Sequence, residues 1–184
     1  MIQHEAGFGM KGAIFFSSKY GSTAQYAEWI REATELPAFD VDKANADLSQ
    51  YDFLVLGSPV LYHKLMFHKW VKSNLEGIKA RPTILFSVSG AGAGAKLDAW
   101  LAGHLPAELI SHVQHVALRG RQDPKDLSWL DRMMLIIGGL TNADPVASKE
   151  ELKGFDFMDK SSIKPIVEKV RHLQGKALPS QKGT

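Results

Sequence analysis

Short, mostly apolar runs recur along the chain and end at turn-forming residues. Because successive side chains in these runs are apolar, instead of every second one, they predict strands buried on both faces of a sheet. The second run is short and includes an acidic residue, which is typical of a sheet edge. The predicted strands are Gly12–Ser17, Phe39–Val41, Phe53–Leu56, Thr83–Val88 and Val113–Leu118.

Amphipathic segments lie between most of these runs. In the first segment, Tyr26 and Ile30 fall on one side of a helical wheel, and Glu28 and Arg31 fall on the other. Pro37 is expected to end this helix. The predicted helices are Thr23–Leu36, Leu65–Leu75, Lys96–Leu105, Leu127–Leu140 and Ile163–Leu173.

Alternation of buried strands with amphipathic helices predicts an α/β fold, in which helices cover both faces of a doubly wound parallel sheet. Five strands in this arrangement favour the strand order 2-1-3-4-5, with a ligand site at the carboxyl ends of the strands. We predict one domain over residues 11–173, with a helical insertion at about 120–158. Residues 1–10 and 175–184 are predicted to be flexible tails.

Composition narrows the classes of protein. The chain has 184 residues, a formal net charge of +2 and no cysteine. The absence of cysteine excludes a disulfide scaffold, cysteine-ligated metal centres and a thiol nucleophile, and is compatible with a cytoplasmic protein. Residues 160–184 carry six Lys or Arg and one Glu, whereas residues 1–159 carry 16 basic and 19 acidic residues. This basic charge is too small for a nucleic-acid groove.

The predicted helix Leu127–Leu140 is unusually apolar and exceeds what five strands need for cover. It contains Asp131 and Arg132 and is shorter than the roughly 20 residues that span a bilayer. We therefore expect neither a membrane span nor a secretion signal in the first ten residues. The helix could pack on the sheet edge, join two copies in a homodimer, or contact a quinone or the inner face of the membrane.

The loop after the first strand, Ser18–Thr23, is rich in hydroxyl side chains and leads directly into a helix. The first N–H groups of a helix lack intrahelical partners and lie at the positive end of its dipole, so this loop is a candidate phosphate site. The alternative interpretation is a helix N-cap formed by Ser22 or Thr23.

Two further strand ends, Gly57–His63 and Ser87–Gly92, are small and almost uncharged. Such loops suit a planar heteroaromatic ligand that bonds to backbone groups and stacks on an aromatic ring. Tyr62 is the aromatic residue best placed to stack, although it could instead fold onto the following helix.

Other motifs do not fit. Gly90–Lys96 has the wrong spacing and position for a Walker A loop, and the chain has no Gly-x-Gly-x-x-Gly dinucleotide fingerprint. The spacing of His63 and His68, and that of His112 and His115, does not favour a metal site. We therefore predict no metal and no hydrolytic triad.

The run Ile14–Ile30 resembles the flavodoxin signature over its full length, and the resemblance extends over residues 11–173. In flavodoxins this loop holds the phosphate of flavin mononucleotide (FMN). The resemblance implies a flavodoxin-like sheet and FMN as the cofactor. The predicted FMN-binding residues lie in the three strand-end loops: Ser18, Lys19, Tyr20, Gly21, Ser22, Thr23, Pro59, Val60, Leu61, Tyr62, Ser87, Val88, Ser89, Gly90, Ala91 and Gly92.

Within that family, Gly57–Tyr62, Phe86–Val88 and Trp129–Met134 are similar to the branch that contains the menaquinone-dependent protoporphyrinogen dehydrogenases. That branch has a basic residue where Lys19 stands and a long insertion ending in an aromatic-x-Asp-Arg helix. The resemblance implies an FMN-dependent oxidoreductase of the protoporphyrinogen or quinone type, with a small-molecule or protein redox partner. No catalytic side chain is predicted, because the flavin performs the electron chemistry.

Two alternatives stay open. One is a soluble flavodoxin-type electron carrier, against which the net charge of +2 counts, since such carriers resemble strongly acidic proteins. The other is a binding module of the same fold that has lost the flavin.

Overall fold

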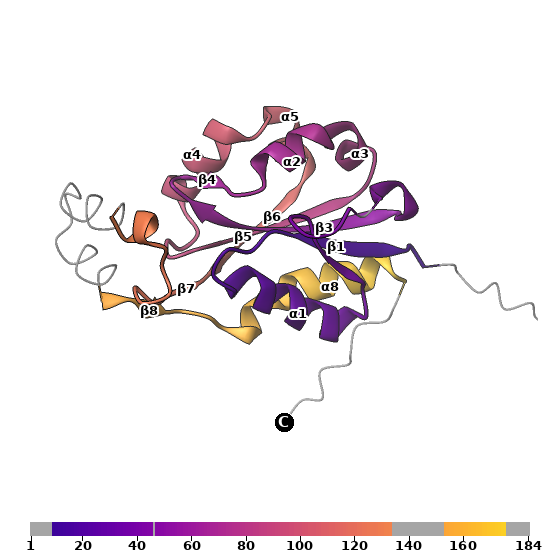
Figure 1. Cartoon of the computed structure of the whole chain (residues 1–184). Coiled ribbons are helices and arrows are strands. Elements are labelled where there is room, and N and C mark those ends of the chain that lie inside the picture. The colour runs from indigo at the N-terminus through magenta and orange to yellow at the C-terminus, as the bar shows by residue number, and fades with distance from the viewer. Residues whose placement is uncertain (1–8, 46, 134–152, 176–184) are drawn as a thin grey trace, which may run out of the picture.

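A twisted, mainly parallel sheet forms the centre of the chain, and helices cover both of its faces (Figure 1). This computed structural model describes residues 9–45, 47–133 and 153–175. The strands of the sheet are β1 (Gly12–Phe16), β2 (Ala38–Asp40), β3 (Phe53–Leu61), β4 (Lys64–Leu65), β5 (Thr83–Ser89) and β6 (Gln114–Arg119). The short strands β7 (Arg121–Gln122) and β8 (Phe155–Asp156) form a separate antiparallel ribbon.

The main strands run in the order β2-β1-β3-β5-β6, with β4 paired antiparallel to β3. Without the hairpin strand β4, this is the predicted order 2-1-3-4-5, so the α/β fold and its topology are confirmed. The register places Ile14 beside Val55, and Val55 beside Ile84.

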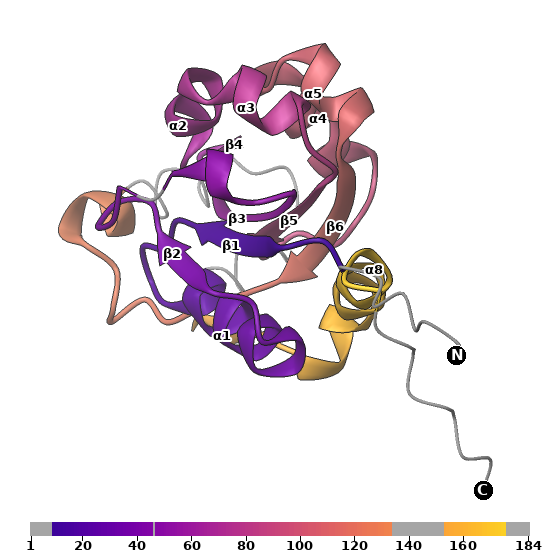
Figure 2. The same cartoon turned by 90° about the vertical axis from the view of Figure 1, so that its right-hand side faces the viewer.

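Two helical layers cover the sheet. In Figures 1 and 2, α1 and α8 lie on one face and α2 to α5 on the other. The helices are α1 (Ser22–Thr34), α2 (His68–Ser73), α3 (Leu75–Lys79), α4 (Ala95–His104), α5 (Ala107–His112) and α8 (Lys164–Leu173), with 3-10 turns at Leu48–Gln50 and Lys160–Ile163. In the described residues, none of the helices is long and apolar enough to span a membrane.

Side chains of the central strands alternate between two apolar cores. Phe15 of β1 packs in the core beneath α2 to α5, whereas its neighbour Ile14 packs in the core shared with α1 and α8. Tyr26 and Ile30 of α1 are completely buried in the second core. Burial on both faces explains why the strands are apolar at successive positions.

Several elements differ from the sequence-based expectation. Strand β3 runs on to Leu61 and turns back into β4, so the predicted helix Leu65–Leu75 begins only at His68. The apolar residues of that segment remain inside, since Phe67 and Val71 are buried. The short helices α3 and α5 were not predicted, because each is too short to show a clear helical period.

Candidate functional site

The carboxyl ends of β1, β3 and β5 meet at one edge of the sheet, where the chain forms a pocket. Three predicted loops contribute to its wall, and the segment after β6 supplies the rest. The lining residues are Ser18, Lys19, Tyr20, Ser22, Thr23, Pro59, Val60, Leu61, Val88, Ser89, Gly90, Gly120, Arg121, Gln122 and Phe155.

The loop between β1 and α1 has the geometry of an anion site. Gly21 precedes the helix in a left-handed conformation, with φ of 87°, and makes no side-chain cap. The backbone N–H of Ala24 donates to the hydroxyl of Ser18 at 3.2 Å, so Ser18 satisfies a donor of the first turn. The N-cap is Gly21, so the alternative interpretation of an N-cap formed by Ser22 or Thr23 is not observed.

Thr23 carries a hydroxyl that is buried without a hydrogen-bond partner. The residue is 1% exposed, and its Oγ1 atom has no partner among the described residues. A buried polar atom left unpaired costs about 1–3 kcal/mol, so such an atom at a ligand pocket indicates that a ligand supplies the partner. The hydroxyl lies in the first turn of α1, beside N–H groups that lack intrahelical partners.

Opposite this loop, the β3–β4 hairpin turns at Tyr62 and His63. Both residues have left-handed backbones, with φ of 51° and 66°. Such conformations cost about 1–3 kcal/mol each for residues other than glycine. The His63 ring stacks on Trp100 with 4.7 Å between ring centroids, whereas Tyr62, which follows the lining residue Leu61, stays 49% exposed. The alternative in which Tyr62 folds onto the following helix is not observed.

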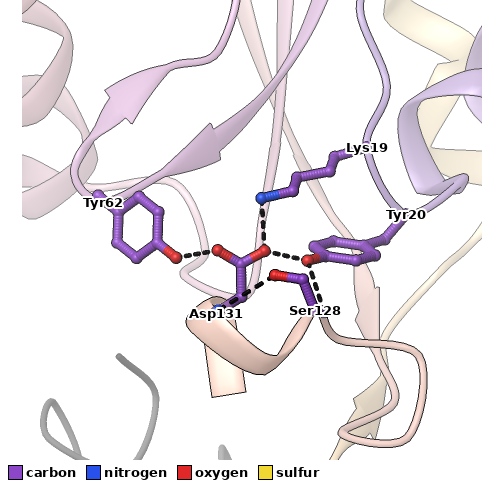
Figure 3. A network of polar contacts seen from close by, with 5 residues as sticks. All are labelled: Lys19, Tyr20, Tyr62, Ser128 and Asp131. Atoms are coloured by element: carbon purple, nitrogen blue, oxygen red, sulfur yellow. Dashed lines mark hydrogen bonds and ion pairs between the residues drawn. The ribbon is translucent and has the colours of Figure 1, made fainter. Parts of the chain in front are cut away.

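A carboxylate from the segment after β7 joins the two loops (Figure 3). Asp131 forms an ion pair of 2.5 Å with the Lys19 ammonium and accepts hydrogen bonds from the hydroxyls of Tyr20 and Tyr62. The backbone N–H of Asp131 donates to the hydroxyl of Ser128, whose own N–H donates to the Tyr20 hydroxyl. Asp131 therefore ties the phosphate-loop candidate to the hairpin turn.

These contacts shift three pKa values. Burial alone would raise the pKa of Asp131, but hydrogen bonds from Lys19, Tyr20 and Tyr62 hold it below its ordinary value. The hydrogen bond to Asp131 raises the pKa of Lys19. Burial, followed by the bond to Asp131, raises the pKa of Tyr62. At neutral pH the cluster therefore holds an ionised carboxylate, a charged ammonium and a protonated Tyr62 hydroxyl.

The third loop is braced by the β7–β8 ribbon and its neighbours. The guanidinium of Arg119 donates to the carbonyl of Gly90 at 3.0 Å and lies 3.5 Å from the ring centroid of Phe157. A Cβ atom on Gly90 would lie 2.6 Å from the Phe155 ring, so only glycine allows this ring so close to the loop. The ribbon thus shapes the side of the pocket formed after β5.

The structure brings most of the predicted site residues together. Eleven of the 16 line the pocket, and five do not: Gly21, Tyr62, Ser87, Ala91 and Gly92. Gly21 and Tyr62 are chain neighbours of lining residues, whereas Ser87 is buried in β5 and its hydroxyl lies 2.8 Å from Nε2 of His115. The assignment of all 16 residues to a cofactor stays a prediction.

Sequence reasoning missed the contribution of the segment after β6. Gly120, Arg121, Gln122 and Phe155 line the pocket, and Asp131 bonds to Lys19 and Tyr20 of its wall. Of these residues, the sequence singled out only Asp131, as part of the aromatic-x-Asp-Arg pattern, and that pattern did not assign it to a site. Residues 134–140 of the predicted helix lie outside the described residues, while Trp129, Leu130 and Met133 are exposed.

A doubly wound sheet with a hydroxyl-rich loop between β1 and α1 and a site at the strand ends is a flavodoxin-like α/β protein. The flavodoxin domain family matches residues 13–142, and the chain therefore belongs to that family. None of the curated proteins matches the chain significantly.

Several solved structures are similar in fold. A flavodoxin from the domain Archaea is 16% identical, with 89% of this chain and all of that chain covered and a TM-score of 0.44. A Fusobacterium nucleatum flavodoxin mutant bound to FMN is 15% identical, with 62% and 72% covered and a TM-score of 0.43. A Lactobacillus acidophilus flavoprotein in complex with FMN is 19% identical, with 60% and 92% covered and a TM-score of 0.40.

Proposed function

We propose that the chain binds FMN, with the phosphate in the Ser18–Thr23 loop, and serves as a redox protein. The observation that carries this proposal is the buried, unpaired hydroxyl of Thr23 at the start of α1. A phosphate oxygen supplies the missing acceptor, and the N–H groups of the first helical turn supply further donors. Membership of the flavodoxin domain family supports the same cofactor.

The remaining walls suit the rest of this cofactor. Tyr62 offers an exposed ring at one side of the pocket, and the loop around Ser89 and Gly90 offers backbone groups at the other. When bound, the isoalloxazine supplies the electron-transfer chemistry. The chain's own residues bind and orient the cofactor, and the protonated Tyr62 hydroxyl stays a hydrogen-bond donor to Asp131 at neutral pH.

A flavin titration tests the proposal. Protein freed of flavin is titrated with FMN, riboflavin and FAD, and binding is followed by the quenching of flavin fluorescence. We expect one FMN per chain and an affinity for FMN at least tenfold above that for riboflavin. Equal affinities for FMN and riboflavin would overturn the proposal, because the phosphate loop would then contribute nothing to binding.

Within this function, we propose a dehydrogenase that acts on a reductant of the porphyrinogen type and passes the electrons to a quinone. Three features favour it over a soluble electron carrier. Lys19 stands in the phosphate loop, Asp131 bonds the segment after β7 to Lys19 and Tyr20 of the pocket wall, and the same segment exposes the apolar side chains of Trp129, Leu130 and Met133. The net charge of +2 also differs from the strongly acidic surface of a carrier.

Anaerobic spectroscopy distinguishes the two. Adding protoporphyrinogen to the FMN-loaded protein should bleach the flavin absorbance, and a menaquinone analogue should restore it. A reduced electron-carrier protein serves as the comparison reductant. Bleaching by the carrier protein but not by protoporphyrinogen would reject the dehydrogenase and favour the carrier.

A further inference from the structure

Arg121 lies against the phosphate-loop candidate although it is 98 or more positions later in the sequence. Its backbone N–H donates to the hydroxyl of Ser22 at 3.3 Å, and the same hydroxyl lies 3.3 Å from its carbonyl oxygen. Ser22 is the first residue of α1. The main chain of Arg121 is therefore held at the point where the anion site begins.

Other contacts fix the backbone on both sides of Arg121. The N–H of Gly120 donates to the carbonyl of Ser89 at 2.8 Å, and the N–H of Phe157 donates to the carbonyl of Gly120 at 3.2 Å. The backbone of Arg121 stands opposite that of Asp156 in the antiparallel β7–β8 ribbon. These contacts, all between described residues, set the position of Arg121 from three directions.

The guanidinium extends over the loop. A Cβ atom placed on Gly21 would have Nη2 of Arg121 as its nearest neighbour, at 4.0 Å. Arg121 also lines the same pocket as Lys19 and the buried Thr23. A side chain at position 21 is already disfavoured by its φ of 87°, so glycine leaves the space between the loop and the guanidinium open.

The charges on this side of the pocket suit a bound phosphate. Lys19 is paired with Asp131, so these two charges offset each other near the loop. Arg121 then gives the wall a net positive charge, next to the positive end of the α1 dipole. A guanidinium presents two parallel N–H donors and binds the oxygens of a phosphate in a bidentate way, which a single ammonium does not.

We infer that Arg121 binds the phosphate of FMN and makes the site selective for a phosphorylated flavin over riboflavin. The inference rests on the proposed FMN function and adds to it a specificity residue from the segment after β6. The segment after β6 then contributes a ligand-binding residue to the cofactor site.

Titrations of single variants test the inference. Arg121→Gln should weaken FMN binding at least tenfold and leave riboflavin binding unchanged, and Arg121→Lys should recover part of the loss. Lys125→Gln is the matched control, because it removes a positive charge from the same segment outside this pocket. It should leave the affinities for both flavins unchanged.

A second readout reports on the phosphate directly. In ³¹P NMR of bound FMN, a guanidinium on the phosphate lowers the pKa of its second ionisation, so Arg121→Gln should raise that pKa relative to the wild type. Thermal melting confirms that the variants fold. If Arg121→Gln unfolds, Arg121→Met, which keeps the aliphatic stem, takes its place in both measurements.

The outcomes separate the two proposals. If the wild type prefers FMN and Arg121→Gln keeps the same preference and the same phosphate pKa, Arg121 is not a phosphate ligand, although FMN binding stands. If the wild type binds FMN and riboflavin equally, the FMN proposal itself fails. Equal losses of FMN and riboflavin affinity in Arg121→Gln also overturn the inference, because the side chain would then act on pocket shape.

Discussion

Replacing Thr23 by Val should have opposite effects on cofactor binding and on the stability of the flavin-free protein. The side chain is 1% exposed, and its hydroxyl has no partner in the described structure. Valine has nearly the same shape, so the substitution removes a buried polar group and creates no large cavity. The flavin-free variant should therefore be at least as stable as the flavin-free wild type. The gain in its free energy of unfolding should not exceed about 1–3 kcal/mol, the cost of an unpaired buried hydroxyl.

FMN binding should become weaker in the same variant. A hydroxyl that donates to a charged oxygen contributes about 1–3 kcal/mol, which corresponds to a loss of affinity of about 5- to 150-fold. Riboflavin has no phosphate, and its affinity should stay the same. Urea unfolding of the flavin-free protein and fluorescence titration with both flavins measure the two effects.

Thr34→Val is a matched control on the same helix. Its buried hydroxyl donates to the carbonyl of Ile30 at 2.6 Å, far from the pocket. Losing this bond should lower the free energy of unfolding by about 0.5–1.5 kcal/mol and leave FMN binding unchanged. If Thr23→Val destabilises the flavin-free protein as Thr34→Val does and FMN affinity is unchanged, the Thr23 hydroxyl is structural and the phosphate-site argument is refuted.

Three further variants test the surroundings of the site. Asp131→Asn should lower the free energy of unfolding by about 1 kcal/mol at pH 7, a modest value because Lys19 is partly exposed. Since the folded-state pKa of Asp131 is depressed, the difference from the wild type in urea unfolding should shrink as pH falls below about 4, and a constant difference would contradict the assigned charge. Burial lowers the pKa of His115, so the unfolded chain takes up its proton first and stability should fall as pH drops below about 6.5. His115→Gln should reduce this loss between pH 7.5 and 5.5, and equal slopes in both proteins would exclude His115 as its source. If the exposed apolar residues after β7 contact a membrane, the double variant Leu130→Glu/Met133→Glu should no longer co-sediment with anionic vesicles. Absence of vesicle binding by the wild type would reject membrane contact.

Much of the fold could be predicted because its signals are local. Strand β1 and helix α1 follow from an apolar run, a turn and an amphipathic segment within Gly12–Thr34. The hairpin after β3 could not be predicted, since Tyr62 and His63 take left-handed conformations that turn rules assign to Gly or Asn. The stacking of His63 on Trp100, a contact distant in sequence, helps to hold that turn.

The candidate site also has one part that local sequence predicts and another that depends on tertiary contacts. Its phosphate loop is continuous in sequence, and a helix start after a buried strand predicts an anion site without any long-range information. Arg121 and Phe155 enter the pocket through two-residue strands, which are too short to show a period. Their places depend on contacts with Ser22, Ser89 and Gly90 that exist only in the folded chain. The family resemblance predicts the phosphate loop, because that loop is continuous in sequence. The selectivity for FMN over riboflavin that we assign to Arg121 depends instead on where the folded chain places its guanidinium.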